Sequence, residues 1–200
     1  MSSGPSRAPS RRLALTLGVF VLGLAALAGG LFAWRQIQGG AVSSGVGAPF
    51  SLTDQNGNTV TDASLRGAPY LLFFGFTHCP DICPSTLYEV SQMLEALGKD
   101  AKARAVFITV DPARDNQGVM KDYLGSFDPR IIGLTGSQEQ IDAVTRAFRV
   151  YARKVEQKDG EYTMDHTAMV YLMDRNGHFV GGFNLKRPPA EAAKEFRRYM

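Results

Sequence analysis

The sequence lacks the features that mark several classes of protein. It has no internal repeat and no second shift in composition after residue 49, which excludes a repeat protein and favours one globular domain of ordinary size. It also has no basic stripe interleaved with aromatic residues. The net charge of +3 includes three arginines that lie before residue 13, and the balance is close to neutral beyond Arg35. We therefore expect no nucleic-acid partner.

Charged side chains are absent from residues 13–34. A helix needs about 20 apolar residues to cross a bilayer, so we expect a transmembrane anchor here. Arginines precede the run, and Arg35 is the only charge between it and Asp54. The positive-inside rule then predicts a cytoplasmic N-terminus (residues 1–12) and a domain across the membrane. The leader is short and lacks an extended Arg/Ser-rich transit segment, which favours a bacterial cytoplasmic membrane with a periplasmic domain over a mitochondrial location. An Ala-x-Ala site at Ala26–Ala28 leaves a cleaved signal peptide as the alternative.

The segment after this run has the composition of a tether. Gln38 to Pro49 is rich in glycine and serine and contains no charge. Such segments are flexible linkers, so we assign residues 35–49 to a linker and residues 50–200 to the folded domain.

Within the domain, short apolar runs alternate with segments of helical periodicity. The pattern predicts strands at residues 70–76, 103–110, 130–136, 168–173 and 178–183, and helices from about Asp81 to a stop at Gly98 and at residues 117–127, 137–150 and 188–199. Asn56-Gly57 predicts a tight hairpin, and Ser137 with Gln140 predicts a capping box. We expect an α/β sandwich with a central, mainly parallel sheet and antiparallel hairpins, an outline that is thioredoxin-like.

Cysteine is scarce: Cys79 and Cys83 are the only two, and both lie where a buried strand gives way to a helix. The amides and dipole of a helix N-terminus stabilise thiolates, so this position predicts a lowered thiol pKa. The pair can form a redox-active disulfide or bind a soft metal, and the spacing leaves both open. A purely structural disulfide is disfavoured because it would close a very small loop. Outside the cytosol, such a pair needs a reductant or a metal.

Histidine is also scarce, which limits the candidates for a third metal ligand to His78, His166 and His178. His166 directly precedes an expected central strand, and strand ends in such sheets gather near one crevice. His78 adjoins Cys79, and adjacent side chains often point apart. His178 begins a hairpin arm and is expected on the surface. A histidine before a strand is more often a core or surface residue, so spacing alone does not make His166 a ligand.

Three motifs together resemble the Sco/SenC family of copper proteins, which assist assembly of the CuA centre of cytochrome c oxidase. They are F-T-H-C-P-D-I-C-P (residues 76–84), V-D-P-A-R-D (110–115) and D-H-T-A-M-V-Y-L-M-D (165–174), and the resemblance extends over the domain from Phe50 onward. It implies a thioredoxin-like fold and one copper ion bound by Cys79, Cys83 and His166.

The chemistry of these donors agrees with copper. Cu(I) is soft and accepts few ligands, and the same donors can hold Cu(II), whereas zinc usually requires a fourth ligand. The expected partners are the CuA-bearing oxidase subunit, a copper donor protein and a thioredoxin-like reductant. The expected function is that of a membrane-anchored copper metallochaperone.

Other residues near the motifs are candidates for supporting roles. Asp165 is placed to orient the histidine, and Asp81 to cap the helix after the cysteine turn. Asp111 and Asp115 match the family's D-P-x-x-D segment, although Asp-Pro after a strand is commonly only a turn. Three methionines are soft donors in principle, but their strand spacing near an apolar run favours the core: Met164, Met169 and Met173.

The alternative function is that of a thiol-disulfide oxidoreductase, with Cys79 and Cys83 reducing cysteines of a partner such as the oxidase subunit. Two departures from thioredoxins count against a general reductase. The motif is C-x-x-x-C, and no proline occurs between Pro129 and Pro188, so the proline that thioredoxins place opposite their cysteines is missing. A peroxide-reducing thiol enzyme ranks third, because Pro80 and Asp81 beside Cys79 do not suggest the environment that it requires.

Overall fold

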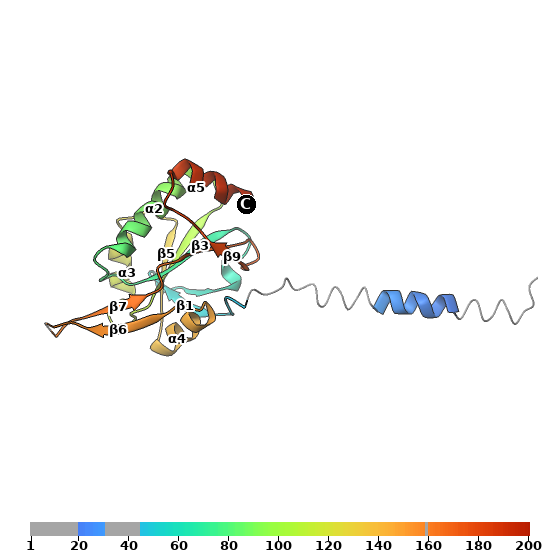
Figure 1. Cartoon of the computed structure of the whole chain (residues 1–200), viewed down its shortest axis with the longest axis horizontal. Coiled ribbons are helices and arrows are strands. Elements are labelled where there is room, and N and C mark those ends of the chain that lie inside the picture. Colours follow the sequence, from blue (N-terminus) through green and yellow to red (C-terminus); the bar gives the residue numbers. More distant parts are fainter. Residues whose placement is uncertain (1–19, 31–44, 159) are drawn as a thin grey trace, which may run out of the picture. The chain divides into compact units, whose positions relative to one another are not determined.

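The computed structural model of the protein describes residues 20–30, 45–158 and 160–200 (Figure 1). These residues fall into two units, one containing residues 20–30 and the other running from residue 45 to the C-terminus. The described residues of the first unit, 20–30, form a helix and are all exposed. The predicted N-terminal segment 1–12 and most of the predicted linker lie outside the described residues.

The expected membrane span at residues 13–34 is described only in part. Its central residues 20–30 are helical. In the part of the chain that the structure describes, no helix is long and apolar enough to cross a membrane.

The second unit is built on a mixed seven-stranded sheet with the order β2-β1-β5-β4-β3-β8-β9. Its centre is parallel, because β4 pairs in parallel with both β3 and β5, while the remaining neighbours pair antiparallel. The strands are β1 (Ser51–Asp54), β2 (Thr59–Thr61), β3 (Tyr70–Gly75), β4 (Arg104–Thr109), β5 (Ile131–Thr135), β8 (Val170–Met173) and β9 (Phe179–Gly182). This arrangement confirms the predicted mixed α/β sheet with a parallel centre.

Burial explains which segments form the central strands. Every residue of β3 is buried, as expected for a strand covered on both faces, and β4 is buried from Ala105 to Thr109. The predicted hairpin at Asn56-Gly57 joins β1 and β2. Only Gly57 has a positive φ there, and the Asp54 carboxylate accepts hydrogen bonds from the amides of Asn56 and Asn58. The turn therefore combines one permissive glycine with one side-chain acceptor.

Helices cover both faces of the sheet, with α2 (Ile82–Leu97) and α5 (Pro189–Phe196) on one side and α4 (Gln138–Ala147) on the other (Figure 1). Helix α3 (Gln117–Leu124) packs against β5. The predicted capping box is confirmed, since Ser137 Oγ accepts from the Gln140 amide and Gln140 Oε1 accepts from the Ser137 amide. Two short 3-10 helices, Ala63–Leu65 and Arg197–Tyr199, complete the unit.

The structure also contains a hairpin that was not predicted. This antiparallel hairpin forms a separate two-stranded sheet. Its strands are β6 (Ala152–Glu156) and β7 (Tyr162–His166). Its register places Ala152 opposite His166. The sequence of β6, ARKVE, has no strong alternation of apolar and polar residues, so it did not predict a strand. None of its five residues is buried. The hairpin supplies the last residue of β7, His166, to the site described next.

Candidate metal centre

Strand β3 and helix α2 position the two cysteines. The chain leaves β3 at Gly75, turns, and enters α2 at Ile82, so Cys79 lies in the turn and Cys83 in the first helical turn. Both are free thiols, Cys83 fully buried and Cys79 only 8% exposed. The Cys83 amide donates to the sulfur of Cys79 across 3.4 Å. Both sulfurs therefore stand at the start of α2, as the sequence predicted.

The capping role predicted for Asp81 is wrong. Asp81 occupies the N-cap position of α2, but its side chain makes no capping hydrogen bond. It accepts instead from the Ser85 hydroxyl at 3.4 Å. The sulfur of Cys79 takes the Cys83 amide, one of the donors that a capping carboxylate would satisfy.

Gly75 leaves room for the buried sulfur. A Cβ at residue 75 would lie 2.7 Å from Cys83 Sγ and 2.7 Å from the ring of Phe107. Real Cβ atoms do not approach other atoms so closely, so any side chain here would displace the sulfur or the ring. Gly75 was not predicted to belong to the site, because a glycine at the end of an apolar strand gives no sign of what packs against it.

His166 reaches the cysteines from the end of β7. Its Nε2 lies 3.6 Å from Cys83 Sγ, and its Nδ1 lies 3.1 Å from the Thr167 carbonyl oxygen. Because a carbonyl only accepts, Nδ1 carries the proton and Nε2 presents a lone pair toward the sulfurs. The rings of Phe76 and Phe73 stand edge-on to the imidazole, with centroids 5.7 and 6.3 Å away. The histidine is thus held in one tautomer and one orientation.

The three residues can hold one ion. One ligand atom each from Cys79, Cys83 and His166 lies within 4.8 Å of the other two. Thiolate sulfur and imidazole nitrogen together are the donor set that copper accepts. The partner that orients His166 is the Thr167 carbonyl and not Asp165, whose side chain is exposed and opposite Arg153 on β6.

Burial controls the charge of the site. It raises the pKa of the Cys83 thiol, and the proximity of Cys79 and Asp115 adds to this, although a backbone hydrogen bond from Phe76 opposes it. The lowered thiol pKa expected from the helix N-terminus is therefore wrong for Cys83, because removal from water outweighs the helix amides. Burial lowers the pKa of His166, with the Thr167 hydrogen bond and the Asp165 charge opposing it. Burial thus favours the neutral form of both the His166 imidazole and the Cys83 thiol.

The other two histidines lie elsewhere. The side chain of His78 is 53% exposed, with Nδ1 3.1 Å from Thr77 Oγ1 and 4.0 Å from a carboxylate oxygen of Asp115. His178 pairs with Asp174 at 3.4 Å on the surface hairpin. Neither belongs to the ligand group at the cysteines, as the sequence analysis expected.

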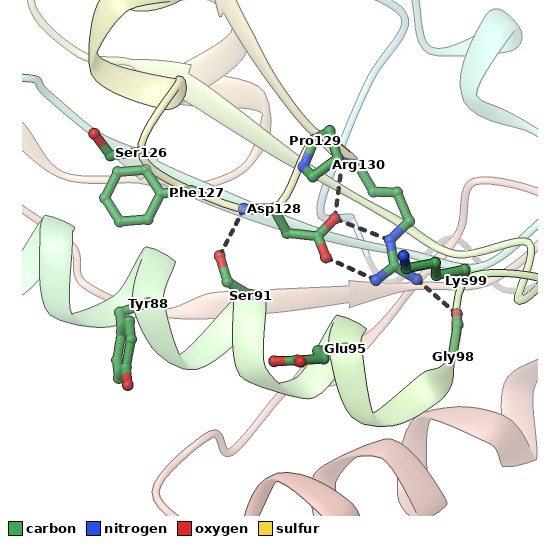
Figure 2. Close-up of a pocket in the computed structure, with 10 residues that line it drawn as sticks. All are labelled: Tyr88, Ser91, Glu95, Gly98, Lys99, Ser126, Phe127, Asp128, Pro129 and Arg130. Atoms are coloured by element: carbon green, nitrogen blue, oxygen red, sulfur yellow. Dashed lines mark hydrogen bonds and ion pairs between the residues drawn. The ribbon is translucent and has the colours of Figure 1, made fainter.

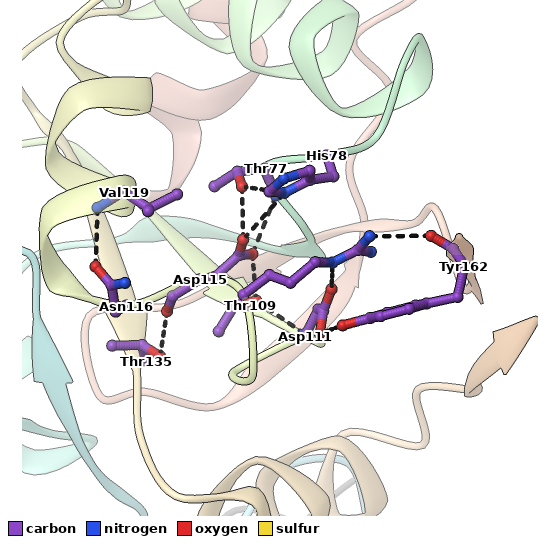
Figure 3. A network of polar contacts seen from close by, with 10 residues as sticks. Thr77, His78, Thr109, Asp111, Asp115, Asn116, Val119, Thr135 and Tyr162 are labelled. Carbon is purple, nitrogen blue, oxygen red and sulfur yellow. Dashed lines mark hydrogen bonds and ion pairs between the residues drawn. The ribbon is translucent and has the colours of Figure 1, made fainter. Parts of the chain in front are cut away.

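The D-P-x-x-D segment does more than turn the chain after β4. The Asp115 carboxylate is fully buried and accepts from the Thr77 amide at 3.0 Å, the Thr77 hydroxyl at 2.5 Å and the Thr109 hydroxyl at 2.6 Å (Figure 3). Thr77 begins the cysteine turn and Thr109 ends β4. Asp115 therefore fastens the cysteine turn to the sheet. Neither threonine was predicted, because only the fold brings their hydroxyls to one carboxylate.

The three methionines have different environments. Met173 is buried in the core, and Met164 is partly buried and packed against it, as predicted. Met169 is 37% exposed, so the core position predicted for it is wrong. Its sulfur covers Gly182 of the neighbouring strand β9, which is a surface contact.

A separate groove of about 690 Å³ lies between α2 and the loop before β5. An ion pair between Asp128 and Arg130, 2.7 Å apart, frames it, and Arg130 also donates to the Gly98 carbonyl (Figure 2). None of the three candidate ligands lines it. The Asp128–Arg130 ion pair of this groove is therefore separate from the candidate metal centre.

Fold and site together define a mixed α/β protein with a three-donor site suited to a soft metal ion. The family model described as SCO1/SenC matches residues 39–200, and the chain belongs to this family. The structure of Bradyrhizobium japonicum ScoI with copper bound is 60% identical, with a TM-score of 0.76 over 78% of this chain and 99% of that one. The SCO2-like protein of Rickettsia felis is 42% identical over 149 residues, 73% of each chain.

A third relative bears on localisation. The mitochondrial SCO1 homolog of Mus musculus is 40% identical over 159 residues, 78% of this chain and 56% of that protein. Relatives of this chain thus include mitochondrial proteins, and the described residues contain no helix that could cross a membrane. The predicted localisation in a bacterial cytoplasmic membrane is contradicted by these two findings.

Proposed function

We propose that the protein binds one copper ion through Cys79, Cys83 and His166 and carries it as cargo to the CuA-bearing subunit of cytochrome c oxidase. The observation that carries this proposal is the convergence of two sulfurs and one imidazole nitrogen within 4.8 Å. Membership of the SCO1/SenC family supports it, as does the copper-bound ScoI of Bradyrhizobium japonicum. We propose residues 50–200, in a thioredoxin-like arrangement, as the domain that performs this function, with residues 35–49 as a linker.

The donors explain why the cargo is copper. Two thiolates satisfy Cu(I) at low coordination number, and the imidazole adds the third donor that Cu(II) requires. His166 presents an unprotonated Nε2, since its other nitrogen donates to Thr167. Cys83 must release its proton on loading, because burial keeps its thiol neutral. An incomplete set of ligands also favours release by ligand exchange with the client.

Two further partners follow from this chemistry. Copper reaches the site from a copper donor protein, because free copper is scarce wherever soft ligands compete for it. A disulfide between Cys79 and Cys83, formed with loss of two electrons and two protons, would remove both thiolates. A thioredoxin-like reductant that returns these electrons and protons would restore the site.

The second candidate function is thiol-disulfide oxidoreduction. It is favoured by one observation: both cysteines are free, and their sulfurs lie within the same 4.8 Å group. The raised pKa of Cys83 weighs against it as the attacking thiol, because the nucleophile is a thiolate. Cys79, which is 8% exposed whereas Cys83 is fully buried, would then have to attack first.

Copper titration of the full chain tests the proposal. The reduced protein should retain about one copper per chain after desalting, since three donors form one site. The protein oxidised to the Cys79–Cys83 disulfide should retain none, because a disulfide lacks thiolate charge. Equal copper retention by the two forms would exclude the assigned site.

A further inference from the structure

The hairpin that carries His166 is not a strand of the main sheet. β6 and β7 pair with each other and form their own two-stranded sheet. The two cysteines, in contrast, belong to the β3–α2 connection at the centre of the fold. The distance between His166 and the sulfurs therefore depends on the contacts that hold the hairpin against the rest of the domain.

Arg114 makes such contacts from the loop after β4. Its Nε donates to Asp111 Oδ2 at 2.5 Å, and its terminal nitrogen donates to the Tyr162 carbonyl on β7 at 3.0 Å. The guanidinium also lies 3.7 Å from the centroid of the Tyr162 ring and 5.9 Å from that of Phe76. Arginine suits this place because its planar group can stack on a ring and donate in several directions at once.

Tyr162 also contacts Asp111, through its side chain. Its hydroxyl donates to Asp111 Oδ1 at 3.0 Å (Figure 3). Asp111 therefore accepts from both Arg114 and Tyr162. Tyr162 is the first residue of β7 and His166 the last, and residues four apart in a strand share one face. The face of β7 that meets Asp111 and Arg114 is thus the face that presents His166 to the cysteines.

The same short loop holds the other half of the site. Asp115 directly follows Arg114 and fastens Thr77, at the start of the cysteine turn. Asp111 is 4% exposed and Arg114 18%, so their ion pair is shielded from water and is stronger than an exposed pair. One loop therefore contacts both the histidine hairpin and the cysteine turn.

From these contacts we propose that Arg114 is the positioning residue of the metal centre. Together with Asp111 and Tyr162 it forms a clasp that holds the β6–β7 hairpin and so sets the distance from His166 to the sulfurs. When the clasp opens, the hairpin withdraws His166 and leaves the two cysteines in place. The effect on copper rests on the proposed function, whereas the effect on the hairpin does not.

Hydrogen exchange of the metal-free full chain tests the clasp without copper. In Arg114→Ala, the amides of β6 and β7 should exchange about tenfold faster, the size expected from losing hydrogen bonds to a charged group. Amides of β3 and β4 should be unchanged. Arg130→Ala removes the Asp128–Arg130 pair at the separate groove and should leave the hairpin at the wild-type rate. Tyr162→Phe keeps the ring under the guanidinium and loses only the hydroxyl, so it should show a smaller effect.

Cu(II) binding by the same variants reads the position of His166. Arg114→Ala should weaken Cu(II) binding about 10-fold to 100-fold, the range for residues that orient a ligand, and should shift the sulfur-to-copper absorption band. Cu(I) binding should change less, because two thiolates suffice for it. Arg114→Lys keeps the charge but not the planar group, and should restore only part of the loss.

The outcomes separate the two proposals. If β6 and β7 exchange at wild-type rates in Arg114→Ala, or if β3 and β4 accelerate equally, the clasp is excluded. If Arg114→Ala does not fold, the same comparison in Tyr162→Phe decides. If the wild-type protein retains no copper while the hairpin of Arg114→Ala exchanges faster, the clasp stands and the proposed copper function fails.

Discussion

The Nε2 atom of His166 lies 3.6 Å from the sulfur of Cys83, although 83 residues separate them in the chain. The imidazole reaches this place on the β6–β7 hairpin, while the sulfur reaches it on helix α2. Because these two elements are far apart in the chain, no pattern within a few neighbouring residues determines this contact. Removing His166 distinguishes a copper carrier, which needs the imidazole as a donor, from a dithiol reductase, which needs only the two cysteines.

His166→Ala should preserve a reducible Cys79–Cys83 pair and lose most Cu(II) affinity. Cu(II) loses its nitrogen donor, so we expect the Cu(II) affinity to fall by more than the roughly 100-fold typical when a residue that only orients a ligand is removed. Copper competition and thiol titration on the same sample measure both properties. His178→Ala, at the surface pair with Asp174, is the matched control and should behave as wild type.

Cells lacking the protein give the biological counterpart of this test. His166→Ala should fail to restore cytochrome c oxidase activity there, because the carrier cannot be loaded normally. If the variant binds copper and supports the oxidase as the wild type does, the histidine is structural and dithiol exchange becomes the leading function.

Copper affinity should rise with pH. Burial raises the pKa of Cys83, so at neutral pH the thiol is protonated and loading must release that proton. The proton released by Cys83 alone makes the apparent affinity increase about tenfold per pH unit between about pH 7 and pH 8, and any proton released by Cys79 adds to this dependence. His166 adds nothing in this range, because burial lowers its pKa and the ring is already neutral. Calorimetry in buffers of different ionisation enthalpy counts the protons, and a pH-independent affinity would contradict this reading.

Gly75→Ala should damage the site through a single methyl group. The added carbon would lie 2.7 Å from Cys83 Sγ, so the sulfur must move or the strand must shift. We expect a loss of about 1–3 kcal/mol in the free energy of unfolding, as for overpacked cores, together with weaker copper binding. Gly181→Ala is the control, since nothing lies within 4 Å of its Cβ position. Urea unfolding and copper competition test both variants, and equal stabilities would show that the space at Gly75 is not needed.

Asp115→Asn should loosen the cysteine turn. The carboxylate accepts three hydrogen bonds in a fully buried place, and an amide turns one acceptor into a donor that faces other donors. We expect a loss of about 2–3 kcal/mol in the free energy of unfolding. Asp122→Asn, on the exposed side of α3, should change stability by less than about 0.5 kcal/mol. Chemical denaturation compares them, and a stable Asp115→Asn would mean that Thr77 is held by other contacts.

The sequence by itself determined the elements that depend on local spacing. Short apolar runs predicted β3, β4 and β5, the Ser137–Gln140 pair predicted the start of α4, and the change from an apolar run to helical periodicity placed both sulfurs at the start of α2. These predictions are correct because hydrogen bonding and side-chain periodicity within a few residues determine such elements. Motif resemblance supplied His166, which spacing alone had left undecided.

Only the tertiary structure decided the rest. It placed His166 on a hairpin whose first strand has no apolar alternation, raised the pKa of the Cys83 thiol that was predicted to be lowered, and brought Arg114 to Tyr162 across 48 residues. Burial and long-range contacts govern all three features. The pKa of a thiol depends on how much water the whole fold removes from it, and a ligand's position depends on what its strand packs against. Neither quantity is encoded within the few neighbouring residues that a sequence pattern can read.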